Sequence, residues 1–249
     1  IKGDTQLQDF ARNFNLIMDK ASVLDESRQE FVSNVSHELK TPITSMKVLA
    51  DSLLGQQGLP EELYQEFLHD ISKEIDREND IITDLLALVR MEKSESEINI
   101  SSVNINEILE AVLKRLKPIA ESKNIELIFE SFRPVVAQID EVKMTQVISN
   151  LVENSIKYNV EDGWVHVSLN ADYQYFYIRV EDSGIGIPEE SINKIFERFY
   201  RVDKSHSKAS GGTGLGLSIV KHAVAYHHGM IDLQSEPGKG TTITVTFPK

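Results

Sequence analysis

Two long stripes of apolar residues constrain the first third of the chain more than any other feature. The first stripe runs from Leu7 to Val35 and the second from Leu63 to Val89, with steps of three and four residues and the turn-forming stretch GQQGLPEE between them. This spacing puts the apolar side chains on one narrow face of each helix, as in helices that pair. Because a two-helix hairpin leaves part of each stripe uncovered, we expect it to dimerise into a four-helix bundle.

After Ile98 the pattern changes to a mixture of helices and strands. A helix is expected in VNINEILEAVLKRLKPIAESKN, with Asn104 or Asn106 near its cap. Strand-like alternation follows in IELIFE, VVAQID, WVHVSLN, YFYIRVED, MIDLQS and TTITVTF, with helical stretches between them. We therefore expect one mixed sheet with helices on one face, and the fold class α+β: a dimeric antiparallel helical hairpin followed by an α/β sandwich.

The turn SHELKTP places three chemically active side chains within the first helix. His37 lies just off the apolar stripe, where solvent can reach it, and Glu38 and Thr41 follow within one turn. Pro42 removes one helical hydrogen bond and can bend the helix there. Two interpretations of Pro42 stay open, a hinge for conformational change or a plain structural kink. A lone histidine is also more often structural than reactive.

Two glycine-rich segments in the second part are typical of a phosphate cradle. EDSGIGIP places Asp182 at the end of a strand, with Gly184 and Gly186 after it, and GGTGLGLS opens directly into a helix. Glycines let backbone N–H groups approach a ligand, and a helix N-terminus favours an anion. Neither segment fits a Walker loop or a Rossmann fingerprint. A carboxylate such as Asp182 can accept a hydrogen bond from the exocyclic amine of adenine.

The helix NLVENSIKYN carries a second polar group. Asn150 and Asn154 lie one turn apart on the same face, and Lys157 and Tyr158 follow. An amide oxygen can join phosphate oxygens around Mg²⁺, Lys157 can neutralise phosphate, and Tyr158 can lie along a base. The alternative is a merely polar helix face.

The charge and composition of the chain argue against some classes of ligand and exclude some kinds of site. The formal net charge of −13 argues against DNA or RNA as the main ligand, because phosphate contacts dominate nucleic-acid affinity. The absence of cysteine excludes disulfides, thiolate metal sites and cysteine nucleophiles. No apolar run reaches the roughly 18 residues of a membrane span. The chain starts with Ile, so we expect a fragment or processed product of a longer protein.

These motifs together resemble the sensor histidine kinases of two-component systems. SHELKTP looks like the phosphoacceptor box, NLVENSIKYN the N box, DSGIGIP the G1 box, IFERFYRVD the F box and GGTGLGLS the G2 box, all in the family's order. DTQLQDFARNFNLIMDKASVL also resembles the closing helix of a HAMP relay module. The resemblance implies a signalling helix at 1–26, a dimerisation and phosphoacceptor domain at 27–97, and an ATP-binding domain of the Hsp90-like type at 98–249.

The resemblance also implies roles for particular residues. His37 would be the phosphorylated residue, Glu38 would orient the imidazole and accept its proton, and Thr41 would help to dephosphorylate the partner. Asn154 would bind Mg²⁺ with support from Asn150. Residues expected around ATP are Lys157 and Arg201 at phosphate, Tyr158 and Asp182 at adenine, and Gly184, Gly186, Gly212, Thr213, Gly214, Leu215 and Gly216 in the glycine boxes, with 202–212 as a mobile lid.

The implied partners are a second copy of the chain and the receiver domain of a response regulator, with no nucleic acid and no membrane segment in this stretch. The implied location is the cytoplasmic portion of a membrane sensor protein. Two other hypotheses stay open at the level of sequence. One is a chaperone- or topoisomerase-like ATPase clamp, and the other is a non-catalytic scaffold that binds ATP and a partner.

Overall fold

The computed structural model describes residues 2–55, 59–93, 99–202 and 212–249 and divides into two compact units, Ile1–Ile81 and Ile82–Lys249. The segment MEKSESE at 91–97, whose polar composition predicts a linker between the two parts, is described only to residue 93, and nearly all of the expected lid also lies outside the described residues. Each unit is described by itself below.

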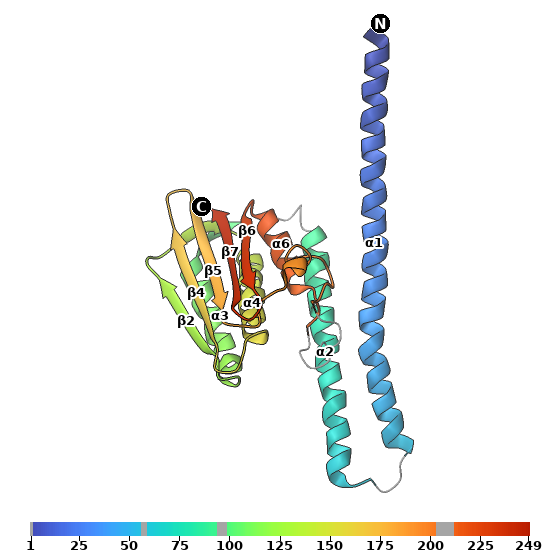
Figure 1. Cartoon of the computed structure of the whole chain (residues 1–249), viewed down its shortest axis with the longest axis vertical. Coiled ribbons are helices and arrows are strands. Elements are labelled where there is room, and N and C mark those ends of the chain that lie inside the picture. Colours follow the sequence, from blue (N-terminus) through green and yellow to red (C-terminus); the bar gives the residue numbers. More distant parts are fainter. Residues whose placement is uncertain (1, 56–58, 94–98, 203–211) are drawn as a thin grey trace. The chain divides into compact units, whose positions relative to one another are not determined.

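The first unit is the predicted helical hairpin. Helix α1 (Lys2–Gly55) and helix α2 (Glu61–Lys93), which continues into the second unit, run antiparallel (Figure 1). Helix α1 continues through Pro42, whose side chain is buried, so the proline does not end the helix. Among the described residues, no helix has both the length and the apolar character of a membrane span.

Apolar side chains stay exposed on both helices of the hairpin. Ile43 and Val48 of α1, and Leu68 and Ile75 of α2, each expose between about two fifths and three fifths of their surface. Burying such side chains contributes about 1.5–3 kcal/mol each. The exposure agrees with the expectation that the hairpin needs another surface to cover it.

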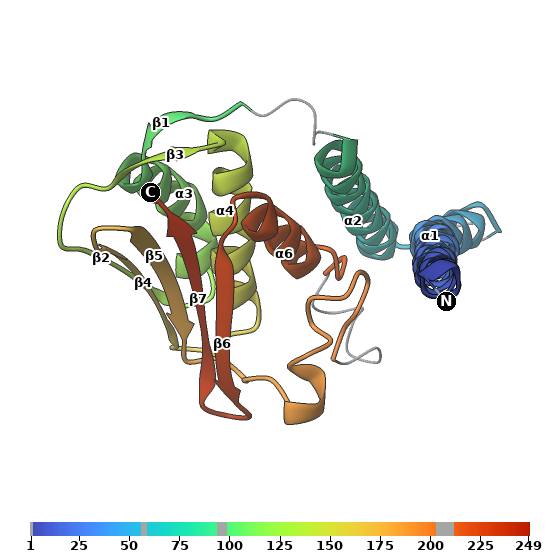
Figure 2. The same cartoon turned by 90° about the horizontal axis from the view of Figure 1, so that it is seen from above.

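The second unit is built on the predicted mixed sheet. Its five strands lie in the order β2-β4-β5-β7-β6, with β2 and β4 parallel and the other neighbours antiparallel. Figure 2 shows the helices on one face of this sheet. The bounds are β2 Glu126–Ser131, β4 Trp164–Ala171, β5 Tyr175–Asp182, β6 Met230–Glu236, β7 Gly240–Pro248, α3 Ile105–Glu121, α4 Glu141–Lys157 and α6 Gly216–Tyr226, with a short 3-10 helix at Glu189–Ser191.

One strand pairs differently from the expectation. The segment VVAQID forms β3 (Val136–Ile139), which lies outside the main sheet and pairs with β1 (Ser101–Asn104) in a two-stranded ribbon. The ladder continues as Ile105 N–H donates to Val135 O, at the start of α3. Asn104 caps that helix, as predicted, by accepting from the N–H of Asn106. Strand β1 was not expected, because a short and mostly polar segment has no apolar alternation.

Side-chain alternation explains which face of the sheet is covered. The inward residues of β4, β5 and β7 are almost all apolar and buried, and the rings of Phe176 and Phe247 stack at 5.2 Å. Their outward neighbours are polar or half-exposed, such as Arg179, Thr242 and Thr244. The buried stripes of α3, α4 and α6 meet the apolar face, so the core lies between the sheet and these helices.

The turn between β6 and β7 approaches the end of β5 closely. Gly240 has φ +101°, and a Cβ there would lie 1.9 Å from the carbonyl oxygen of Asp182. Gly238 also has a positive φ, +77°, but a Cβ there would meet nothing within 4 Å. The two glycines therefore separate the cost of backbone conformation from the cost of close contact.

We predict that Gly240→Ala lowers the free energy of unfolding by more than about 3 kcal/mol, since it adds overpacking against backbone to left-handed strain. Gly238→Ala should cost only about 1–2 kcal/mol, from strain alone. Chemical denaturation of both variants measures the difference. Equal losses would show that conformation, and not contact with Asp182, requires glycine at 240.

Candidate functional site

Helix α4 carries the polar side chains of the candidate site along one edge. Its apolar stripe is buried in the core, which leaves Asn150, Asn154 and Lys157 half-buried at the edge of that stripe. The helix ends at Tyr158, whose N–H donates to Asn154 O at 3.0 Å. Among the described residues the Asn154 carboxamide has no hydrogen-bond partner, so its oxygen is available to a ligand.

Asp182 lies at the end of β5 and is almost completely buried. Its carboxylate accepts from Ser155 Oγ at 2.9 Å, from Gly184 N–H at 3.0 Å and from Thr241 N–H at 3.2 Å. Burial raises the pKa of Asp182 above its ordinary value, and these donors partly oppose the rise. The protein thus holds a carboxyl group in a fixed orientation where water has little access.

The first glycine box joins the end of β5 to the end of α4. A Cβ at Gly184 would lie 2.4 Å from Tyr158 O, and Ile185 N–H donates to the same carbonyl at 3.1 Å. Gly186 has φ +69° and lies against the backbone of Glu236, the last residue of β6. The box therefore needs glycine for close approach, and it brings the end of β5, where Asp182 lies, against the backbone of Tyr158.

The second glycine box lies against the same edge of α4, from Asn150 to the C-terminal end at Lys157 and Tyr158. A Cβ at Gly212 would lie 2.4 Å from Lys157 Nζ and 3.1 Å from Tyr158 Oη. Arg201 donates to Gly212 O, so its guanidinium lies at this box rather than apart from it. Asn150 Nδ2 donates to Gly216 O at 3.2 Å. Lysine, arginine and amide groups thus converge on one glycine segment.

Backbone geometry at the second box favours an anion. Helix α6 begins at Gly216, and its N-cap residue Leu215 offers no side-chain cap, so the first N–H groups are not capped. Thr213 Oγ1 accepts from Leu215 N–H at 3.1 Å, and Leu215 itself is buried. Gly214 has φ +71° and accepts at its carbonyl from Phe199 N–H at 2.9 Å.

The turn around His37 belongs to the other unit. His37 and Thr41 are exposed on α1, and Glu38 is half-buried. Thr41 Oγ1 donates to His37 O at 3.1 Å. No hydrogen bond joins the side chains of His37 and Glu38 in the described chain, as expected for neighbours in a helix, which do not face each other. The orienting role of Glu38 stays a prediction.

Some contributors were not expected from the sequence. Ser155 and Thr241 fix the Asp182 carboxylate, and Phe199 supports Gly214 from a left-handed conformation with φ 62°. Ser155 carries a usable signal, because a serine on the buried face of a helix needs a polar partner. Thr241 carries none, since its contact is set by a chain crossing distant in sequence. Phe199 belongs to the segment IFERFYRVD noted above, although its contact with Gly214 was not expected.

Comparison with known proteins finds one family match in the helical hairpin and one in the part with the sheet. Residues 27–94 match the His Kinase A (phospho-acceptor) domain, and residues 139–249 match the histidine kinase-, DNA gyrase B- and HSP90-like ATPase domain. The chain is 38% identical over 228 residues to the sensor histidine kinase WalK of Bacillus subtilis, covering 90% of this chain and 37% of that protein. It is also 38% identical over 227 residues to WalK of Staphylococcus aureus, covering 90% and 54%. The chain thus spans about half or less of these relatives.

Solved structures agree. The catalytic domain of histidine kinase ThkA is 30% identical, with a TM-score of 0.53, covering 61% of this chain and 99% of that one. Histidine kinase ThkA in complex with the response regulator TrrA gives a TM-score of 0.71 at 26% identity, covering 88% of this chain and 61% of that one. Both the hairpin and the sandwich therefore have counterparts in this family.

We predict that Asp182→Asn weakens ATP binding by about 10-fold or more, because a hydrogen bond to a charged group contributes about 1.5–3 kcal/mol and the amide presents a donor as well as an acceptor. Asp232→Asn, on the exposed side of β6, is the matched control and should bind as the unchanged chain does. Titration calorimetry with ATP measures both. Equal affinities in the two variants would remove Asp182 from the binding site.

Proposed function

The chain belongs to the sensor histidine kinases of two-component systems, and we propose that it transfers the γ-phosphoryl group of ATP to His37 and from there to an aspartate of a response regulator. The observation that carries the proposal is that one chain holds both halves of such a reaction. The exposed imidazole of His37 lies in the matched phosphoacceptor domain, and Lys157, Asp182 and both glycine boxes converge in the matched ATPase domain.

The site on α4 suits ATP in particular. Asp182 offers a fixed acceptor for the exocyclic amine of adenine, and Tyr158, at the C-terminal end of α4, offers a ring that can lie along the base. Lys157 and Arg201 lie at Gly212, next to the uncapped start of α6, where phosphate is favoured by charge and by N–H groups. The converging groups thus run from a base-binding end to a phosphate-binding end.

The metal expected with ATP is Mg²⁺, and the residues present fit it. The half-buried carboxamide of Asn154, without a described hydrogen-bond partner, would supply a hard oxygen ligand, with Asn150 one turn away, and phosphate oxygens and water would complete the shell. Bound there, the ion would neutralise charge on the phosphate groups. The role of Lys157 and Arg201 is to hold the same phosphates by charge and hydrogen bonding.

The proposed reaction has two balanced transfers. One nitrogen of the neutral His37 imidazole attacks the γ-phosphorus, the bond from that phosphorus to the β–γ bridging oxygen breaks, and ADP leaves. The other ring nitrogen gives up its proton, with Glu38 as the adjacent acceptor. A regulator's aspartate carboxylate then attacks phosphorus, the P–N bond breaks, and the ring nitrogen that gave up its proton takes it back from Glu38, which restores the neutral imidazole. Positioning supplies most of the rate for both steps.

The homodimer and the setting of the chain are part of the same proposal. The exposed apolar residues of α1 and α2, together with the match to the phosphoacceptor domain, support pairing of two copies into a four-helix bundle. The proposed divisions are a HAMP-like signalling helix at 1–26, the phosphoacceptor domain at 27–97 and the ATP-binding domain at 98–249. We place the chain in the cytoplasmic portion of a membrane sensor, by analogy with its relatives.

A second activity, dephosphorylation of the regulator, is favoured by the position of Thr41. Its side chain is exposed one turn after His37, on the same helix face. The hydroxyl hydrogen bonds to His37 O, while the oxygen can still accept from a water molecule in line with an acyl phosphate. Thr44 makes the same kind of bond, to Lys40 O at 2.8 Å, and it is also exposed.

We predict that His37→Gln abolishes covalent labelling by γ-labelled ATP and leaves ATP affinity unchanged, because the nucleophile and the nucleotide site lie in different units. His69→Gln, an exposed histidine of α2, is the matched control and should label normally. Excess EDTA should abolish the label in every protein. The label should be acid-labile and alkali-stable, as phosphohistidine is.

Other outcomes of the labelling experiment separate the rival functions. Release of phosphate with no covalent label would indicate an ATPase clamp, and binding with neither label nor release would indicate a scaffold. Acid-labile label that persists in His37→Gln would assign the phosphoacceptor to another residue.

We predict that Thr41→Ala lowers dephosphorylation of a cognate regulator by at least about 10-fold, or about 1.4 kcal/mol of barrier, and leaves labelling of His37 largely intact. Thr44→Ala removes an equivalent side-chain bond to the helix and should change neither rate. Both rates are measured on one preparation of each variant. Equal effects of the two substitutions would mean that Thr41 acts only through helix structure.

A further inference from the structure

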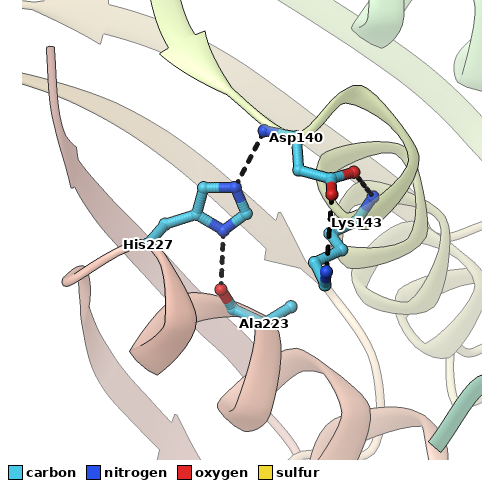
Figure 3. A network of polar contacts seen from close by, with 4 residues as sticks. All are labelled: Asp140, Lys143, Ala223 and His227. Carbon is cyan, nitrogen blue, oxygen red and sulfur yellow. Dashed lines mark hydrogen bonds and ion pairs between the residues drawn. The ribbon is translucent and has the colours of Figure 1, made fainter. Parts of the chain in front are cut away.

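A buried histidine joins the two helices that carry the candidate site. His227 follows the last residue of α6 and is 6% exposed. Its Nδ1 lies 2.8 Å from Ala223 O, and its Nε2 lies 3.0 Å from the backbone nitrogen of Asp140, the N-cap residue of α4 (Figure 3). The ring therefore connects the end of one helix to the start of another.

The two partners fix the protonation state of His227. A backbone N–H can only donate, so Nε2 must carry the lone pair that accepts from Asp140. A carbonyl can only accept, so Nδ1 must carry the hydrogen that is donated to Ala223. Only the neutral imidazole satisfies both bonds, and burial lowers the pKa of His227 below its ordinary value. Protonation would place an N–H of the ring against the N–H of Asp140.

The charged groups around His227 do not remove the need for a neutral imidazole. The Asp140 carboxylate binds the N–H of Lys143 at 3.1 Å and its Nζ at 3.4 Å, and that Nζ lies 4.0 Å from the ring centroid of Tyr226. Asp140 favours the charged imidazole, whereas Lys143 and His228 disfavour it. On the β7 side the neighbour is the edge of Phe247, with ring centroids 5.9 Å apart, which carries no charge.

Helices α4 and α6 are linked by polar bonds at two places. At one end Asp140 N–H donates to His227, and at the other Asn150 Nδ2 donates to Gly216 O. At the rise of an α-helix, the two bonded positions lie about 15 Å apart along α4 and about 16.5 Å apart along α6. The two distances are similar and the helices are antiparallel, so both bonds can form at once in only one register. A shift of α6 along α4 at the His227 end therefore also moves Gly216 relative to Asn150.

We propose that His227 is a positioning residue for nucleotide binding, whose neutral imidazole holds α6 in register with α4 so that Gly216 and Asn150 stay aligned. The proposal rests on the proposed function, because it assigns the same α4 edge and glycine box to ATP. His227 does not touch the nucleotide in this arrangement. It acts through the helices, and acidification weakens the site by charging the ring.

The test compares two substitutions of His227 in the full chain. Gln retains an acceptor for Asp140 N–H but cannot be protonated in the tested range, and Leu fills the apolar space without an acceptor. Affinity for ATP with Mg²⁺ is measured by calorimetry from pH 7.5 to pH 5.5, alongside thermal unfolding. We expect His227→Leu to lose between about 3- and 30-fold in affinity at pH 7.5. We expect the unchanged chain to lose more affinity on acidification than His227→Gln does.

A control variant and a second measurement keep the outcomes distinct. His228→Asn changes an exposed neighbour whose left-handed φ of 54° asparagine tolerates, and at pH 7.5 it should bind ATP as the unchanged chain does. Without nucleotide, NMR of the unchanged chain should show the Gly216 amide signal shifting with pH together with the His227 ring, and this measurement does not depend on whether His227→Leu folds.

Three outcomes would each overturn the proposal: wild-type affinity in a folded Leu variant, superimposed pH profiles for the unchanged chain and the Gln variant, or a Gly216 amide signal that does not change as His227 titrates. Failure of the unchanged chain to bind ATP would instead overturn the proposed function, while the NMR titration still decides the positioning role.

Discussion

The packing of helix α4 into the core is the constraint on which the rest of the second unit, referred to below as the ATPase unit, depends. One stripe of this helix is buried between the sheet and its neighbouring helices, and that burial fixes its rotation. The rotation sets Asn150, Asn154 and Lys157 along a single half-buried edge. Both glycine boxes then close against this edge, one at Tyr158 and one at Lys157 and Asn150. Core packing and the geometry of the candidate site are therefore set by the same helix.

Burial of polar groups at the two ends of α4 gives this unit its specificity. At the C-terminal end, burial of Asp182 costs desolvation energy, and three hydrogen-bond donors hold its carboxylate in one orientation as an acceptor. At the N-terminal end, Asp140 and His227 are buried, and the His227 ring is hydrogen bonded to the backbone of Asp140 and of Ala223. Polar groups in such places are satisfied in only one arrangement, so they select one register of α6 on α4.

The hairpin follows a different physical logic. Its helices expose apolar residues such as Val48 and Ile75 that a compact domain would bury, and His37 projects into solvent. A phosphoacceptor has to be reached by more than one partner, so exposure of His37 suits its proposed role. The exposed apolar residues suit pairing with a second copy. The unit thus supplies access and assembly, whereas the ATPase unit supplies a fixed site.

The sequence by itself determined the helices, the strands of the main sheet, the Asn104 cap and the two glycine boxes, because periodicity, alternation and turn chemistry are local properties. It also singled out His37, Asn154, Lys157 and Asp182 as candidates for the reaction and the binding site. Only the tertiary structure decided which segments and side chains meet. It pairs β1 with β3, supplies the donors that hold Asp182, makes Gly212 the acceptor of Arg201, and requires a neutral ring at His227. Each of these depends on segments distant in the chain that meet when the core forms, and residue spacing along a sequence does not encode such meetings.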